Sequence, residues 1–300
     1  NISKYFIKQP KHLCRRLFGF LSFIEYFNYK NRSFNKDLKF LLDLSDGQLV
    51  NKKNYRLIEK NLLSFSKIPF VTFCIRKSIL NQSSFPIILS PDPHFYLSKG
   101  YLELKDSIQL KINKDNQFNF FDRKSYIKKA YWRGGPNGIS STGSKKDIDR
   151  IIFCQKVFNN PSFNVRLVSD DNFFNKYENL KNIRGEPEDF LENMKYFISI
   201  DIDGNTASWT GNYGKLLLGC NVVKLTSKDP LIQWYYKYDS FEKCLTNCFS
   251  IDELINVCQN QIYNIEKLEN EIIKKKNSAR NFALSLNYSN ENEIFFNKLI

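Results

Sequence analysis

From residue 70 onward, short apolar runs alternate with turn residues and with segments of helical periodicity. Short apolar runs of this kind are typical of the buried strands of a parallel sheet. The pattern predicts strands at 70–75, 86–89, 130–132, 165–168, 196–201 and 222–225, and helices at 145–158, 187–194 and 213–219. Strands that alternate with helices form βαβ units, so we expect an α/β fold with a mostly parallel sheet.

Two amphipathic segments lie outside this alternating region. Apolar residues between 251 and about 276 fall on one stripe, which predicts a single long helix. Residues 13–30 hold a dense phenylalanine cluster that Glu25 interrupts, and the run is shorter than the ~20 residues of a spanning helix. Two interpretations stay open for this segment: a helix packed on its own domain, or an amphipathic helix in a membrane interface.

The composition narrows the class of protein. With 42% hydrophobic and 25% charged residues, the chain has the balance of a soluble globular protein, which excludes a disordered tail, a collagen-like fibre and a multi-span membrane protein. Single cores stop growing near 250–300 residues, so a chain of 300 residues predicts two lobes. The net charge of +14 favours anionic partners without choosing among phosphorylated small molecules, nucleic acid and lipid headgroups.

Cysteine and histidine usage indicates neither a disulfide framework nor a zinc site. The seven cysteines lie mostly inside apolar runs without a CxxC pair, and the chain has two histidines. Buried thiols of this kind persist in a reducing compartment, so we expect a cytoplasmic protein. No helix-turn-helix, zinc-finger or aromatic RNA-binding signature is present, and the basic residues are scattered, so we expect no nucleic-acid partner.

Two glycine-rich stretches, 131–138 and 201–211, each follow a predicted strand and precede a predicted helix. Glycines let backbone N–H groups approach an anion, and ligands of open α/β sheets bind at the carboxyl ends of strands. Neither stretch fits the P-loop or the dinucleotide-binding fingerprint, and a structural turn explains either one better when it is taken alone. The Asp201-x-Asp203 triplet allows a divalent-cation site or a turn-capping aspartate.

Several blocks occur in a characteristic order: Trp132-Arg133-Gly134, Arg150, residues 195–209, residues 216–225, Gln233-Trp234-Tyr235 and residues 277–283. Together they resemble glycosyltransferase family 90, which includes bacterial lipopolysaccharide-modifying transferases, fungal capsule-associated transferases and animal protein O-glucosyltransferases. The resemblance covers about residues 120–285 and is most specific over 195–225.

The resemblance implies a fold of the GT-B kind, with two Rossmann-like lobes, a cleft between them and a long C-terminal helix. We expect an acceptor-side lobe at 1–125, a nucleotide-sugar lobe at 126–260, and helices at 261–300 that pack back across both lobes. It further implies inverting transfer from a nucleotide sugar, in particular a UDP-sugar, to lipopolysaccharide or a related glycan, without a metal or another cofactor. The setting that it implies is the cytoplasm, with peripheral contact at the inner membrane face through residues 13–30 as the interfacial alternative.

The family motifs carry over to specific positions. Arg133 and Gly134 match an Arg-Gly loop beside the donor, and Arg150 matches an arginine that contacts the diphosphate. A guanidinium suits that contact because its planar fork binds phosphate oxygens bidentately. The expected donor-binding residues are Arg133, Gly134, Gly135, Arg150, Asp203, Gly204, Asn205, Ser208, Asn212 and Lys215.

Two positions depart from the family pattern. Asn212 stands where the family has a second diphosphate-binding arginine, and Lys77 stands where it has the catalytic aspartate. Because an ammonium is a poor general base unless burial lowers its pKa by several units, Asp92 is the substitute candidate, with a proline-flanked turn residue as its alternative role. The departures also allow a catalytically impaired protein that binds a sugar nucleotide or glycan.

Overall fold

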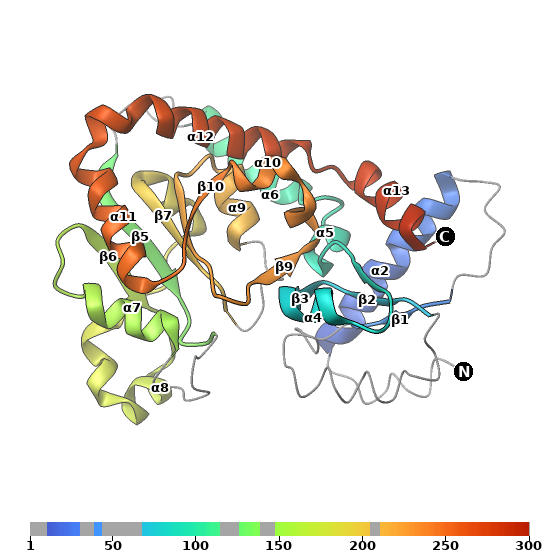
Figure 1. The fold of residues 1–300 in the computed structure, drawn as a ribbon, viewed down its shortest axis with the longest axis horizontal. Coiled ribbons are helices and arrows are strands. Elements are labelled where there is room, and N and C mark those ends of the chain that lie inside the picture. Colours follow the sequence, from blue (N-terminus) through green and yellow to red (C-terminus); the bar gives the residue numbers. More distant parts are fainter. Residues whose placement is uncertain are drawn as a thin grey trace.

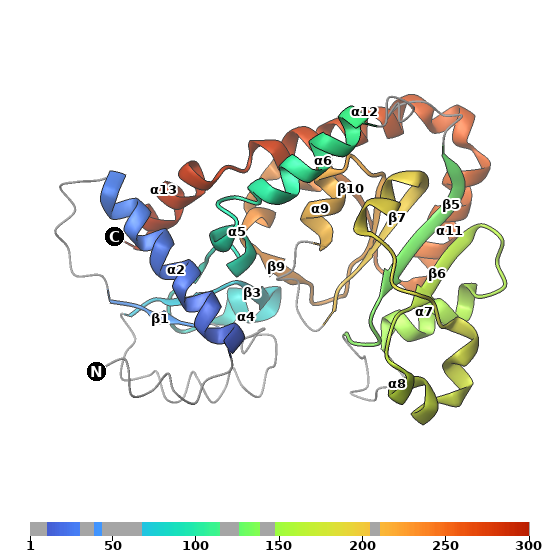
Figure 2. The ribbon, with the colours of Figure 1, turned by 180° about the vertical axis from the view of Figure 1, so that it is seen from behind.

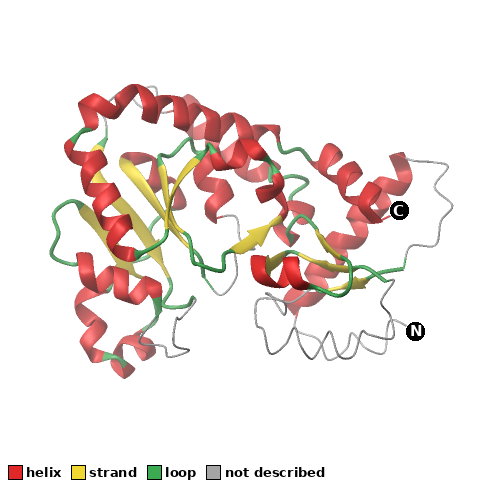
Figure 3. Ribbon diagram, in the orientation of Figure 1, coloured by secondary structure: helices red, strands yellow, loops and turns green. Residues whose placement is uncertain are grey.

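The computed structural model describes residues 11–30, 39–43, 68–114, 126–138, 148–204 and 211–299. Within these residues the chain forms two parallel sheets side by side, with helices packed around them (Figures 1 and 3). The predicted α/β class with parallel strands is therefore confirmed.

The smaller sheet has three short strands in the order β1-β2-β4, all parallel. Its strands are β1 (Leu41–Leu42), β2 (Phe70–Thr72) and β4 (Ile87–Leu89), and β3 (Cys74–Arg76) leaves it to pair antiparallel with β9 (Leu231–Gln233). The prediction of one strand at 70–75 is wrong, since the chain bends at Phe73 and the two halves join different sheets. Both halves are buried, so hydropathy gave no sign of the bend.

The larger sheet has five parallel strands in the order β10-β8-β7-β5-β6. They are β5 (Ile127–Gly134), β6 (Phe163–Leu167), β7 (Tyr196–Ile202), β8 (Val222–Leu225) and β10 (Leu245–Cys248). The chain moves from β5 to β6 on one side and then crosses back to β7 on the other. The strand order therefore reverses between β5 and β7, which is the topological switch point of the sheet.

The pleat of β8 directs neighbouring side chains to opposite faces of this sheet. Val223 belongs to a core with α7 (Asp149–Val157) and α11 (Ile251–Tyr263), and Val222 belongs to a core with α9 (Gly211–Leu217). The second core continues without interruption to the helices beside the three-stranded sheet, so one apolar cluster joins elements near both sheets.

The predicted helix at 13–30 is confirmed as α2 (Lys11–Lys30), which lies beside α13 (Tyr288–Leu299) in both views (Figures 1 and 2). Phe23 is buried, with its ring centroid 5.9 Å from that of Phe295 and 5.7 Å from that of Phe296. Phe20 and Phe27 are buried as well, whereas Phe18 is 66% exposed. One face of α2 therefore packs on its own protein. None of the described helices combines the length and the apolar character that crossing a bilayer requires.

A long C-terminal helix is present as α12 (Ile265–Ser285), but it does not begin at residue 251 as predicted. The stripe is divided between α11 and α12 at Asn264, whose Nδ2 donates to the carbonyl oxygen of Asn260 at 3.0 Å. Such a side chain competes with the helical backbone pattern, and the apolar stripe continues across the break because both helices pack on the same core.

The other predicted helices differ from the prediction in their limits. The helix predicted at 145–158 is present as α7, with residues 145–147 outside the described part, and the helix predicted at 213–219 is present as α9, which has the same length and begins two residues earlier. The segment 187–194 forms a 3-10 helix, η5 (Phe190–Lys195). The remaining elements are α4 (Lys77–Gln82), α5 (Pro93–Leu97), α6 (Leu102–Lys114), α8 (Asp171–Lys176), η4 (Glu178–Ile183), η6 (Trp234–Lys237) and α10 (Asp239–Glu242).

Candidate functional site

A pocket lies at the carboxyl ends of β5 and β7, at the switch point of the five-stranded sheet. Its cavity volume is about 250 Å³. The lining residues are Tyr131, Trp132, Arg133, Arg150, Glu188, Asp189, Phe190, Asn193, Asp201, Ile202, Gly211 and Lys215. Ligands of open α/β sheets bind at this place because the loops diverge there and leave a crevice. The topology thus marks this pocket as the candidate site.

Three cationic side chains reach the pocket from three separate elements. Arg133 lies near the end of β5, Arg150 lies in the first turn of α7, and Lys215 lies in α9. All three are donor-binding residues that the sequence predicts, and the fold brings them together on one cavity.

Arg133 is held by protein acceptors. Its Nη2 lies 2.7 Å and its Nε 3.1 Å from Oε1 of Glu188, and it also donates to Asn164 and to the Trp132 carbonyl. Oε2 of Glu188 accepts from the hydroxyl of Tyr131 at 2.8 Å. Glu188 therefore occupies the position that an anionic ligand of Arg133 would take.

Arg150 bridges the loops that follow β5 and β7. Its Nη2 and Nε donate to the carbonyl oxygen of Ile202 at 2.7 and 3.2 Å, and its Nη1 donates to Oδ1 of Asn137 at 2.8 Å. The guanidinium carbon lies 5.4 Å from the ring centroid of Trp132. Burial lowers the pKa of Arg150, and the nearby Asp201 and Asp203 act in the opposite direction. The side chain therefore fixes one wall of the pocket.

Buried charges of alternating sign extend from Lys215 into the protein. Nζ of Lys215 lies 2.9 Å from Oδ1 of Asp201, and Nζ of Lys224 lies 2.8 Å from Oδ2 of Asp201 and 2.6 Å from Oδ1 of Asp203. Lys215 also donates to the carbonyl oxygen of Ile200 at 2.7 Å, which leaves its third N–H without a partner among the described residues. That N–H is available to a ligand in the pocket.

The two aspartates have opposite pKa shifts. Burial alone would raise the pKa of Asp201, but the ammonium groups of Lys215 and Lys224 outweigh it and hold that pKa well below its usual range. Burial raises the pKa of Asp203, and the charge of Asp201 adds to this effect against that of Lys224. Both carboxylates thus face lysine ammonium groups, and among the described residues no three His, Cys, Asp or Glu side chains lie together as a metal site.

Two buried acceptors at the end of β7 and in α9 have no hydrogen-bond partner among the described residues. They are Oδ2 of Asp203 and Oδ1 of Asn212, and the side-chain Nδ2 of Asn212 donates to the hydroxyl of Tyr236 at 3.3 Å. Asn212 is therefore a buried neutral residue and not the cation that the family pattern has there.

One glycine of each glycine-rich stretch has a packing role. A Cβ on Gly134 would lie 2.4 Å from Cζ2 of Trp132, so only glycine lets that ring fold against the strand end. A Cβ on Gly135 would meet its nearest atom, Oδ1 of Asn137, at 3.4 Å, and one on Gly204 would lie 3.1 Å from Nη2 of Arg150. Gly134 and Gly204 thus make room for the side chains that form the pocket wall.

The candidate base is outside this pocket's lining. Asp92 caps α5: its Oδ1 accepts from the backbone N–H groups of His94 and Phe95 at 2.8 and 3.0 Å, and its Oδ2 accepts from the hydroxyl of Tyr101. The geometry fits the alternative role of a turn residue. Lys77 begins α4 with an exposed side chain, and its backbone N–H donates to the Pro230 carbonyl at 3.0 Å. Asn205 and Ser208 lie outside the described residues.

Sequence reasoning missed four residues of the pocket, namely Glu188, Asp189, Phe190 and Asn193. They lie between β6 and β7, on a segment that carries neither a glycine-rich loop nor a strand end. The one available signal was the acidic pair Glu188-Asp189 after Pro187 in a chain of net charge +14.

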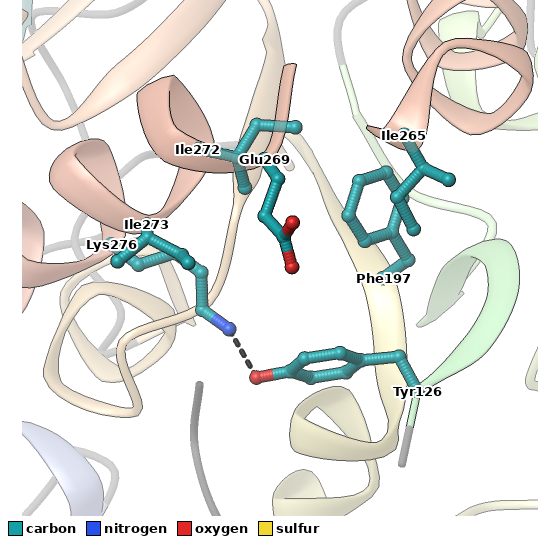
Figure 4. A pocket seen from close by; sticks show the side chains of 7 residues that line it. All are labelled: Tyr126, Phe197, Ile265, Glu269, Ile272, Ile273 and Lys276. Carbon is teal, nitrogen blue, oxygen red and sulfur yellow. Dashed lines mark hydrogen bonds between the residues drawn. The ribbon is translucent and has the colours of Figure 1, made fainter. Parts of the chain in front are cut away.

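A second, smaller pocket lies between β7 and α12, with a cavity volume of about 20 Å³ (Figure 4). Nζ of Lys276 donates to the hydroxyl of Tyr126 and lies 4.1 Å from its ring centroid, and the carboxylate of Glu269 points into the same space. Burial lowers the pKa of Lys276 to about 8. This volume holds about one water molecule and is too small for a nucleotide.

No protein-family model matches the chain, and no curated protein matches it in sequence. Among solved structures, the chain is similar to WaaG, a glycosyltransferase involved in lipopolysaccharide biosynthesis, with 12% identity, a TM-score of 0.40, and coverage of 75% of this chain and 60% of WaaG. It is similar to the sucrose-phosphate synthase of Thermosynechococcus elongatus, with 8% identity, a TM-score of 0.47, and coverage of 91% and 70%.

A third similar structure is the UDP-GlcNAc 2-epimerase of Neisseria meningitidis bound to UDP-GlcNAc, with 13% identity, a TM-score of 0.37, and coverage of 98% of this chain and 83% of the epimerase. The chain thus spans less than two thirds of WaaG and most of the epimerase. These activities belong to those proteins, and the function of this chain depends on the residues of its own pocket.

Proposed function

We propose that this protein is a glycosyltransferase of the GT-B kind, related to family 90, that transfers a sugar from a nucleotide sugar to a glycan acceptor. The observation that carries the proposal is the convergence of Arg133, Arg150 and Lys215 on one pocket at the switch point of a parallel sheet. Arg133 and Arg150 belong to the sequence blocks that resemble the family, and Lys215 directly precedes the block at 216–225. The proposed donor is a UDP-sugar and the proposed acceptor is lipopolysaccharide or a related glycan.

The chemistry of the leaving group explains the need for these cations. When the sugar leaves a nucleoside diphosphate, negative charge grows on the diphosphate, and preorganised donors stabilise it. The third N–H of Lys215, from α9, and the guanidinium of Arg150, from α7, are the groups that would do this. Arg133 would join them once the ligand replaces Glu188. The pocket is smaller than the ~300–1,000 Å³ of typical ligand pockets, so it would hold only part of the donor.

We propose that transfer is inverting, as the family resemblance implies. We further propose that it uses no metal ion, because Lys215 and Lys224 already supply the positive charge beside Asp201 and Asp203. A second candidate function is a protein that binds a nucleotide sugar without transferring it. The capping contacts of Asp92 favour it, since both oxygens of the candidate base are engaged.

The proposal also includes contact between α2 and a membrane. The exposed side of α2 carries Phe18, 66% exposed, and Leu21, 42% exposed, together with Arg15. We propose that this side touches the inner face of the cytoplasmic membrane. Replacement of Phe18 by serine should then reduce cosedimentation with anionic phospholipid vesicles, whereas serine in place of the exposed Phe249, remote in sequence, should not.

Calorimetric titration with UDP, UDP-glucose and UDP-GlcNAc, followed by a search for slow hydrolysis of radiolabelled donors, tests the function. We expect binding by the unmodified protein and a loss of at least tenfold in UDP affinity in Lys215→Met. Lys156→Ala is the control, because Lys156 is a surface residue of α7 that pairs with Asp252. Binding without hydrolysis or transfer supports the non-catalytic candidate, and absence of binding to every nucleotide contradicts both.

A further inference from the structure

A buried carboxylate and a buried tyrosine form a pair at the starts of α5 and α6, away from the lining of the pocket. Oδ2 of Asp92 accepts a hydrogen bond from the hydroxyl of Tyr101, and both side chains are almost completely buried. Oδ1 of Asp92 accepts from two backbone N–H groups of α5, at 2.8 and 3.0 Å. The cap of α5 therefore uses one carboxylate oxygen, and the second oxygen holds the tyrosine hydroxyl.

The backbone that carries Tyr101 has an unfavourable conformation. Lys99, Gly100 and Tyr101 all have a positive φ, at 46°, 84° and 61°. In this left-handed region a Cβ approaches the following carbonyl oxygen, so such a conformation persists only where surrounding contacts hold it. The N–H of Tyr101 donates to the hydroxyl of Ser98 at 2.9 Å, and the Tyr101 hydroxyl donates to Asp92. These two contacts fix the Tyr101 ring against the preference of its own backbone.

The Tyr101 ring contacts α9, the helix that carries Lys215 of the pocket. It stacks on the ring of Tyr213, with the ring centroids 4.4 Å apart and the planes at 30°. The hydroxyl of Tyr213 donates to the carbonyl oxygen of Ala283 in α12 at 2.8 Å. The fully buried Tyr213 is therefore held on its ring by the loop before α6 and at its hydroxyl by α12.

The position of α9 determines where the ammonium group of Lys215 lies. The helix has seven residues, Gly211–Leu217, and a helix this short is not stable without tertiary contacts. Tyr213 and Lys215 point to nearly opposite sides of it, because each residue advances by about 100° around the axis. Tyr213 packs in the apolar core, and Nζ of Lys215 lies 2.9 Å from Oδ1 of Asp201 at the pocket. A shift of Tyr213 therefore moves Lys215.

We propose that Asp92 and Tyr101 are positioning residues for donor binding: they hold α9 through Tyr213 and so place the ammonium group of Lys215 at the diphosphate. This inference rests on the proposed function. The carboxylate of Asp92 is buried and both of its oxygens accept hydrogen bonds, so Asp92 acts through Lys215 and not on the acceptor hydroxyl.

Two conservative substitutions separate the positioning role from the cap of α5. In Asp92→Asn the side-chain oxygen still caps α5, since asparagine is an equally good N-cap, and an amide group replaces the acceptor of the Tyr101 hydroxyl. Tyr101→Phe keeps the ring and removes the hydroxyl. We expect each variant to bind UDP about fivefold more weakly in calorimetric titration. Tyr238→Phe, which removes a similar hydrogen bond of 2.7 Å to Glu291 of α13, is the matched control and should leave UDP affinity unchanged.

A double-mutant cycle with Lys215 distinguishes positioning from a general loss of stability. In the Lys215→Met protein, Tyr101→Phe should change UDP affinity by less than about twofold, because the group that it positions is absent. The inference is overturned if Tyr101→Phe causes equal losses with and without Lys215, or if both single variants bind UDP as well as the unmodified protein. Loss of sugar transfer in Asp92→Asn at unchanged UDP affinity would identify Asp92 as the base instead.

Hydrogen exchange followed by mass spectrometry gives a second measurement that needs no ligand. The amides of α9 should exchange faster in Tyr101→Phe than in the unmodified protein, and those of α7, which packs on the other core, should not change. Unchanged exchange in α9 also overturns the inference. In these cases UDP binding by the unmodified protein still supports the proposed function, whereas absence of binding to every nucleotide contradicts both. Melting temperatures establish that each variant is folded.

Discussion

Glu188 accepts two hydrogen bonds from the guanidinium of Arg133, from Nη2 at 2.7 Å and from Nε at 3.1 Å. The side chains are 31% and 13% exposed, so the pair lies at the edge of the pocket, within reach of solvent. A carboxylate placed this way competes with any anion that Arg133 could bind. The pair also connects the acidic segment before η5 to the end of β5, two parts of the chain that are distant in sequence.

Removal of the competing charge should improve anion binding. In Glu188→Gln, the amide holds Arg133 less strongly, and we expect a roughly threefold gain in affinity for UDP and inorganic pyrophosphate, consistent with the ~0.2–1 kcal/mol of partly exposed ion pairs. Calorimetric titration measures the two affinities. Glu178→Gln, at an exposed residue paired with Lys181, is the control. Unchanged or weaker binding would show that Glu188 serves only to support Arg133.

Arg150 should contribute to stability as well as to binding. In Arg150→Ala the carbonyl oxygen of Ile202 loses both of its donors from this side chain, so we expect a loss of about 1–3 kcal/mol in the free energy of unfolding together with loss of UDP binding. Urea denaturation and calorimetry separate the two effects. Arg184→Ala, at a surface arginine that pairs with Asp171, is the matched control. An Arg150→Ala protein of unchanged stability would contradict the bridging role.

Asp201 and Asp203 should differ sharply in their contribution at neutral pH. Asp201→Asn breaks two buried ion pairs, so we expect it to lower the free energy of unfolding by about 3–5 kcal/mol. Asp203→Asn should lower it much less, because burial already disfavours the ionised form of that carboxyl group. Urea denaturation at pH 7 measures both. Asp171→Asn, at a side chain that is 75% exposed, is the control. Equal losses in the two variants would contradict the opposite pKa shifts.

The pH dependence of stability has its origin in the same shifts. Because the folded pKa of Asp201 lies below its unfolded value of ~3.9, its ion pairs stabilise the fold fully above about pH 4 and are lost as the pH falls towards the folded pKa. Asp203 has a raised folded pKa, so its ionisation costs stability as the pH rises through that value. Acid denaturation curves of Asp201→Asn should therefore lose steepness below pH 4.

The adjacent residues Gly134 and Gly135 should differ in their tolerance of an added methyl group. Gly134→Ala would place a methyl group 2.4 Å from the Trp132 ring, and displacement of that ring would disturb Arg150 above it, so we expect a loss of about 1–3 kcal/mol. Gly135→Ala meets its nearest atom at 3.4 Å and should be close to neutral. Thermal denaturation of the two variants distinguishes this packing role from a general need for glycine in the loop.

The sequence predicts the cationic part of the site better than the acidic part. Arg133, Arg150 and Lys215 follow predicted strands or begin predicted helices, and the ends of parallel strands meet at one edge of a sheet, so their convergence follows from local patterns. Glu188 begins the helix predicted at 187–194, but it reaches the pocket through a tertiary contact with Arg133 that no local pattern predicts. The side-chain partners of Asp92 were equally invisible, because its hydrogen bond from Tyr101 depends on how the loop folds.

Elements were predicted more reliably than their limits. Hydropathy located β7 and the middle of β5 because these stretches are buried. It extended one helix through Asn264, where a side-chain hydrogen bond marks the break. It also joined β2 and β3 across Phe73, since burial on both sides of the bend leaves the apolar run continuous. Domain limits and the roles of Asn205 and Ser208 stay predictions.

The course of α12 has a consequence for how the molecule can move. Ile265 and Ile272 of this helix are buried in the core shared with α7 and α11, while Ala279 and Phe282 of the same helix are buried in the core that extends to α2. Because α12 is packed into both cores, it resists the hinge rotation by which many two-domain enzymes close over a substrate. We therefore expect the dimensions measured by small-angle X-ray scattering to stay constant when UDP binds, with enclosure of the ligand left to side chains such as Glu188.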